Sequence, residues 1–120
     1  MLASKLRGLA LRLRASTGAA PASLASHMRL VADRAEALAA DAAIQGEGAA
    51  AGHLAAVCSA LRDAARSPDP DTLVLAAETQ ADRLDCAADW AAARDDLAVP
   101  DFLRGGAAPR GLRLVAGGRA

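Results

Sequence analysis

Residues 24–42 read LASHMRLVADRAEALAADA, and this stretch decides the fold. Its apolar side chains recur at alternating steps of four and three residues, at Leu24, Met28, Val31, Ala35, Leu38 and Ala42. Because an α-helix completes a turn in about 3.6 residues, this spacing places the six side chains on one face. The stretch therefore predicts a helix with one buried face, which begins near Pro21 and is interrupted at Gly46.

Three other segments carry helical patterns bounded by glycine or proline. We expect helices at 2–15, at 49–66, and from Pro70 to about Leu97, where Pro100 stops the last one. The residues expected to face inward are Leu2, Leu6, Leu9 and Leu13, then Leu54, Val57, Cys58, Leu61 and Ala65, then Leu73, Ala77, Leu84, Ala88 and Ala91. Short connections favour antiparallel neighbours. The predicted fold is all-α, a small antiparallel helical bundle of three to four helices.

The content of large apolar side chains is low. Hydrophobic residues make up 53% of the 120 residues, but 35 of them are alanine and only 27 are Leu, Val, Ile, Met, Phe or Trp. Alanine favours helix strongly but has little side chain to bury. We therefore expect a thin core that is completed by burial against a second copy or another protein.

Composition divides the chain into three parts, within a length that fits one domain. We expect residues 1–17 to form a basic amphipathic helical arm and residues 18–104 to form the helical bundle. Residues 105–120 are rich in glycine and arginine and have no periodic pattern. We expect this C-terminal tail to be flexible, either disordered or bound to a partner.

Charge is segregated along a chain whose net charge is zero. Residues 1–31 hold five basic side chains and no acid, whereas residues 32–101 hold all fourteen carboxylates against five arginines. With one Phe, one Trp and no Tyr, the chain has few rings to stack on bases, so nucleic-acid binding is disfavoured. Without a membrane-spanning run or a cysteine framework, a cytoplasmic protein is expected, and the alanine and arginine bias suggests a bacterial one.

The first helix is the most suggestive candidate for a binding element. We predict that it contacts a partner through Leu2, Leu6, Leu9, Leu13 and Arg12. A leucine stripe bordered by cations fits a groove on another protein, an anionic membrane surface, or the chain's own bundle. The arginine-rich, acid-free start also fits an organelle transit peptide.

The long fourth helix carries a second candidate surface, away from its inward face. Leu75, Cys86, Trp90 and Leu97 form an apolar strip roughly 120° from the core seam, at about 100° per residue. Tryptophan is a common anchor in interfaces, so the strip is predicted to bind a partner. The alternative is that the first helix or the tail covers Trp90.

The fourth helix also carries a stripe of carboxylates. Its members are Glu78, Asp82, Asp85, Asp89 and Asp96. A metal site in a bundle needs Glu-x-x-His motifs on facing helices, and the sequence has none. We expect the stripe to face water, and the alternative is docking of a basic partner or of the chain's own basic ends.

The sequence offers no motif for catalysis or for a cofactor. His27 and His53 are the only imidazoles, and no local pattern joins either one to a nucleophile and an acid. Nucleotide-binding glycine loops and the nucleophile-elbow motif are also missing, and no small-molecule substrate is evident. We therefore expect a protein that is not an enzyme and that binds neither cofactor nor metal.

One segment resembles part of a known family. Residues 54–66, LAAVCSALRDAAR, are similar to the third helix of histidine phosphotransfer domains, which are four-helix bundles of this length. Those domains carry their phospho-accepting histidine in a His-x-x-Lys-Gly pattern shortly before this helix, where this chain reads AAIQG at 42–46. The resemblance implies a bundle, without the acceptor.

Three functions follow from these patterns. The leading hypothesis is a non-enzymatic interaction protein, a small subunit, adaptor or regulator that self-associates or docks on a larger assembly. The second is a degenerate phosphotransfer-like signalling module that uses His27 or His53. The third is association of the basic ends with an anionic membrane or nucleic acid.

Overall fold

The structure is a computed structural model that describes the backbone of residues 2–105 and the side chains of residues 2–94. It contains the helices α1 (Leu2–Ser16), α2 (Pro21–Ile44), α3 (Gly48–Ala64) and α4 (Pro70–Gly105). The described residues include no strand. The all-α fold predicted from the apolar spacing is confirmed.

Local sequence explains where α2 and α4 begin. Pro21 is the first residue of α2, a position where the missing N–H costs nothing because no helical partner exists for it. Asp69 precedes α4 and caps it: its carboxylate accepts hydrogen bonds from the Thr72 hydroxyl at 2.7 Å and from the Asp71 N–H at 3.3 Å. The Thr72 hydrogen bond, with weaker help from the backbone, holds the pKa of Asp69 below its usual value.

A glycine-dependent turn closes α2 and leads into α3. Gly46 has φ of +79°, a left-handed conformation that side chains with a Cβ rarely adopt. The Glu47 N–H donates to the Ala42 carbonyl at 2.8 Å, and the Gly46 N–H donates to the Ala43 carbonyl at 3.1 Å. This pair of bonds is the Schellman arrangement, which satisfies carbonyls at the end of a helix. The turn sends α3 back along α2.

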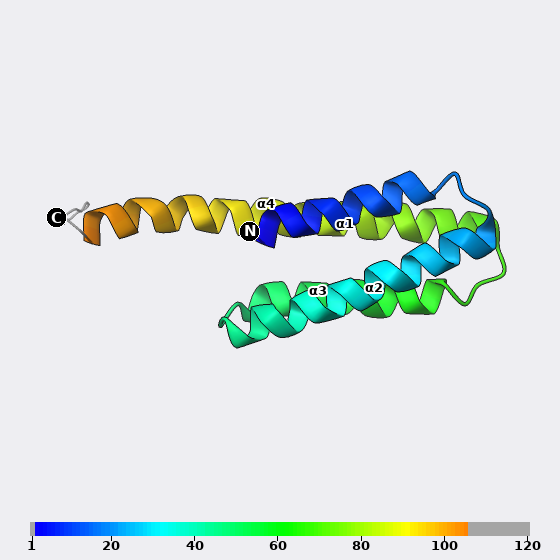
Figure 1. Cartoon of the computed structure of the whole chain (residues 1–120), viewed down its shortest axis with the longest axis horizontal. Helices are drawn as coiled ribbons and strands as arrows, with labels where there is room; N and C mark the ends of the chain where they lie inside the picture. Colours follow the sequence, from blue (N-terminus) through cyan, green and yellow to red (C-terminus); the bar gives the residue numbers. More distant parts are fainter. Residues whose placement is uncertain (1, 106–120) are drawn as a thin grey trace.

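The four helices form two layers, which Figure 1 shows as an upper and a lower pair. Helix α1 lies along α4, α2 lies along α3, and these two pairs have the most extensive contacts in the molecule. The α1–α2 and α3–α4 edges between the layers have fewer contacts. The bundle is long and narrow, with Cα positions spanning 59 × 24 × 17 Å.

The core is built from leucines set among fully buried alanines. The largest fully buried side chains come from all four helices: Leu6, Leu13, Leu24, Met28, Val31, Leu54, Leu61, Leu73 and Leu84. Every predicted inward-facing residue of α3 and α4 is buried, while Leu38 of α2 and Leu2 of α1 are half-buried. The predicted helix faces therefore match the observed core.

Helix α1 is part of the bundle in this structure. Its leucines Leu6, Leu9 and Leu13 are at most 6% exposed and belong to the same core cluster as the residues of α2, α3 and α4. The sequence predicted an arm separate from a bundle at 18–104, with packing on the bundle as one of its alternatives. The structure shows this alternative, because the leucine stripe of α1 packs against an apolar face of α4.

The predicted end of α4 near Leu97 is wrong. The helix continues through Pro100 to Gly105, so Phe102 and Leu103 lie in its last turns. Proline removes one backbone donor and crowds the carbonyl four residues earlier, which kinks or weakens a helix but does not always end it. The rest of the predicted tail, residues 106–120, lies outside the described residues.

Two leucines of α1 test whether this helix belongs to the cooperative fold. Leu6 is 0% exposed and Leu11 is 68% exposed, so Leu6→Ala leaves a cavity and Leu11→Ala does not. We expect Leu6→Ala to lower the free energy of unfolding by about 2–5 kcal/mol and Leu11→Ala to change it by less than about 0.5 kcal/mol. Urea denaturation followed by circular dichroism measures both, and equally small effects would mean that α1 is not packed.

The cap on α4 gives a pH-dependent prediction. The folded pKa of Asp69 is lowered, so its carboxylate stabilises the fold above the unfolded pKa of about 3.9, and this contribution is lost as the pH falls through the folded pKa. Asp69→Asn should therefore lower the melting temperature at neutral pH, with a difference that disappears in acid. Glu78→Gln, at an exposed position of the same helix, is the control and should give no such trend.

Candidate interaction surfaces

The apolar strip predicted on α4 is exposed where the structure describes its side chains. Trp90 is 72% exposed and Leu75 is 65% exposed, and the free thiol of Cys86 also faces solvent. Helix α1 therefore does not cover Trp90, and the other alternative, covering by the tail, falls on residues outside the described part of the chain. The side chain of Leu97 lies outside the described residues.

Trp90 stands beside two hollows at the edge between α3 and α4. The hollows have volumes of about 640 Å³ and 330 Å³, and both are lined by His53, Ala87 and Trp90. Alanines make up half of the lining of the smaller hollow, whereas the larger one is also lined by Thr79, Asp82, Arg83 and Cys86 of α4. Sequence analysis found the tryptophan but not the hollows, because most of their α3 side is alanine, which carries no periodic signal of its own.

Polar groups frame this edge without forming a catalytic set. Arg94 of α4 pairs with Glu47 before α3, with 3.6 Å between Nη1 and Oε1. His53 is exposed on α3, and His27 lies on α2 with its Nδ1 2.8 Å from the Ser23 carbonyl. Neither histidine has a hydrogen-bonded carboxylate among the described residues, so neither is oriented as a general base. The arrangement suits docking of an apolar surface.

Three carboxylates of the acidic stripe of α4 pair with arginines of α1, so the alternative, docking of the chain's own basic start, is present beside the expected exposure to water. Arg7 pairs with Asp89 at 2.7 Å, and Arg14 pairs with Asp82 at 2.7 Å and with Asp85. These carboxylates remain partly or largely exposed, so they are both hydrated and paired. The hydrogen bonds to Asp85 and then Asp82 raise the pKa of Arg14. Glu78 is exposed, and the side chain of Asp96 lies outside the described residues.

The ion pairs also fix the register of α1 on α4. Arg7 and Arg14 are seven residues apart, and their partners Asp89 and Asp82 are seven residues apart in the opposite direction. This spacing is expected for two antiparallel helices whose contacts repeat every seven residues. Comparable salt bridges join α3 to α2, where Arg62 pairs with Asp33 at 2.7 Å and with Glu36 at 2.9 Å.

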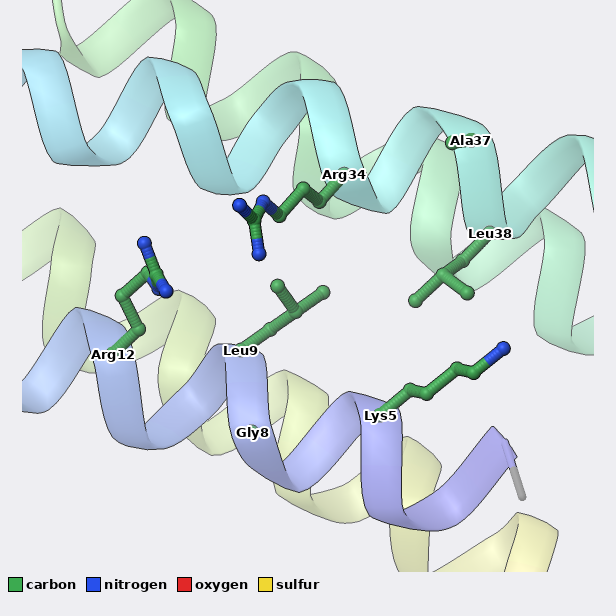
Figure 2. Close-up of a pocket in the computed structure, with 7 residues that line it drawn as sticks. All are labelled: Lys5, Gly8, Leu9, Arg12, Arg34, Ala37 and Leu38. Carbon is green, nitrogen blue, oxygen red and sulfur yellow. The ribbon is translucent and has the colours of Figure 1, made fainter.

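A second groove lies at the opposite edge, between α1 and α2. Figure 2 shows Leu9 of α1 and Leu38 of α2 pointing into the gap between the helices, with Lys5, Arg12 and Arg34 around it. The groove has a volume of about 510 Å³. Arg12 was a predicted contact residue. Arg34 was missed, because the sequence of α2 does not tell which flank of its buried face lies toward α1.

The predicted contact residues of α1 therefore divide into two groups. Leu6, Leu9 and Leu13 are buried inside the chain, and only Leu9 also lines the groove. Leu2 is half-buried against the core, and Arg12 is exposed at the groove. A partner that needed the whole leucine stripe would have to displace α1 from α4.

The described residues contain no group of three or more His, Cys, Asp or Glu side chains that could hold a metal ion. Among the described helices, none combines the length and apolarity that crossing a bilayer requires. Compared with known protein families, curated proteins and solved structures, the chain shows no significant match.

The salt bridges between α1 and α4 lead to a prediction about exchanging their charges. Arg14→Glu places three carboxylates together, so we expect it to reduce the free energy of unfolding, with a smaller loss in high salt because exposed charges are screened. Adding Asp85→Arg should restore part of the loss, and a double-mutant cycle by urea denaturation measures the coupling. Arg66→Glu, which disturbs only a local pair with Asp63, is the matched control and should cost less.

Proposed function

We propose that this chain is a non-enzymatic protein–protein interaction module, a small helical subunit that docks on a larger assembly or on itself. The observation that supports the proposal best is the exposed indole of Trp90 beside alanine-lined hollows. A ring of this size left 72% exposed in a chain so poor in large apolar residues is an unusual use of apolar surface.

The α3–α4 edge suits an apolar helix from a partner. Alanine side chains let two helix backbones approach closely, and a neighbouring tryptophan can then fold over the incoming helix as an anchor. Leu75 and Cys86 extend the same exposed strip along α4. Docking there would bury apolar surface that the thin core of the chain leaves in water.

The phosphotransfer alternative has less support. His53 is exposed and therefore reachable, but alanines, Trp90 and an arginine already paired with Glu47 share its hollow. No described lysine lies with it, and the sequence lacks the acceptor pattern. Absence of phosphoryl transfer from a phosphorylated receiver domain would leave the interaction proposal as it stands.

Trp90 supplies a direct test because it is the only tryptophan in the chain. We expect its fluorescence emission to be that of a hydrated indole in the free protein and to shift to shorter wavelength in a complex. Trp90→Ala should weaken binding of a partner purified with the intact chain by about tenfold or more, as interface anchors do. The melting temperature should change little, since the side chain is exposed.

Leu11→Ala is the control for this test, because Leu11 is a similarly exposed apolar residue on a different helix. Its partner binding should equal that of the unaltered chain. Complexes that leave the tryptophan emission unshifted and that survive Trp90→Ala unchanged would refute docking at the α3–α4 edge.

A further inference from the structure

The groove between α1 and α2 has an apolar base and a basic rim. Leu9 of α1 and Leu38 of α2 point into it from the two helices, and Gly8 and Ala37 also line it. Lys5 and Arg12 from α1 and Arg34 from α2 stand around these apolar residues. All three cationic side chains belong to exposed residues.

The three cations have no acidic partner within residues 2–94. The acids next to Arg34 in the sequence, Asp33 and Glu36, both pair with Arg62 of α3, while Asp41 lies exposed about one turn beyond Leu38. The carboxylates of α4 that contact α1 form salt bridges with Arg7 and Arg14, which lie on the other flank of α1. The groove therefore keeps a concentrated positive charge beside an apolar base, an arrangement that attracts an apolar segment with negative charges.

Helix α1 offers the same pattern on both of its flanks. Arg7 and Arg14, one heptad apart, border its leucine stripe on the side where α4 lies. Lys5 and Arg12, also one heptad apart, border the stripe on the side of the groove. The second pair leaves positive charge along the groove, which an acidic segment would neutralise.

The chain itself contains a segment with these properties, at the end of α4. Residues 95–103 read DDLAVPDFL, with three carboxylates, no cationic residue, and the apolar residues Leu97, Val99, Phe102 and Leu103. In Figure 1 the end of α4 runs beyond the start of α1, and no other described helix lies beside it there. At about 1.5 Å per residue, residues 95–103 extend over about 12 Å, and the groove-lining stretch of α1 from Lys5 to Arg12 extends over about 10 Å.

The end of α4 and the groove lie toward the same end of the molecule. Helix α1 starts and α4 leaves the bundle at that end, and the residues of the groove come from the first half of α1 and the second half of α2. Two copies related by a twofold axis there could each lay the end of α4 along the other's groove. Such an interface is closed and self-complementary, as in most homodimers.

We infer that the α1–α2 groove receives residues 95–103 of α4 from a second copy of the chain, so that two copies form a reciprocal dimer. The inference deepens the proposed function, since it names one partner and one surface. It uses the edge opposite to Trp90, so the two proposals can fail separately.

Light scattering of the full-length chain tests the inference. We expect a dimer, and we expect Arg12→Glu combined with Arg34→Glu to raise its dissociation constant by about tenfold or more, because attraction becomes repulsion at two positions. Raising the salt concentration should weaken the dimer of the unaltered chain in the same direction. Arg66→Glu, which makes the same kind of substitution once at the other end of the bundle, should leave the dimer intact.

Charge exchange separates this contact from damage to the fold. The triple variant Asp95→Lys/Asp96→Lys/Asp101→Lys should also give monomers, with the helix content of the unaltered chain. Mixed with the Arg12→Glu/Arg34→Glu chain, this variant should form heterodimers, because both contacts then join opposite charges. A monomeric full-length chain, or a dimer that both sets of substitutions leave unchanged, would overturn the inference while leaving docking at Trp90 to its own test.

Discussion

Close approach of helices across alanine is the constraint on which the structure depends. Ala10, Ala32, Ala35, Ala77, Ala81 and Ala88 are each 0% exposed, one or more on α1, α2 and α4. Small side chains at these positions bring the helix backbones together, so that few leucines are enough to fill the space between them. Larger residues at the same positions would force the helices apart and separate the leucines that they now surround.

The sequence predicted what depends on local spacing. The starts at Pro21 and Pro70, the interruption at Gly46 and the inward faces of all four helices follow from periodicity and from the backbone chemistry of proline and glycine. The end of α4 did not follow, because Pro100 has only a local rule, and that rule allows a helix either to stop or to continue with a kink.

Pairing between helices was harder to predict than the helices. The leucine stripe of α1 and the acidic stripe of α4 were both visible in the sequence, yet nothing local says that Arg7 reaches Asp89. The same limit hid Arg34, whose meaning depends on Asp33 and Glu36 being taken by Arg62 of another helix. A cation becomes informative only once the acids around it are assigned, and that assignment is a property of the tertiary structure.

The distribution of acids gives the two edges of the bundle different characters. At the α1–α4 and α2–α3 contacts, arginines and carboxylates form salt bridges with one another. At the α1–α2 edge the cations have no acidic partner within residues 2–94, and at the α3–α4 edge the indole of Trp90 is exposed. A thin core cannot absorb either feature, because a cation loses hydration on burial and a tryptophan needs more neighbours than alanines provide. Both edges therefore expose the kind of group that a second surface, of opposite charge or of matching apolarity, would stabilise.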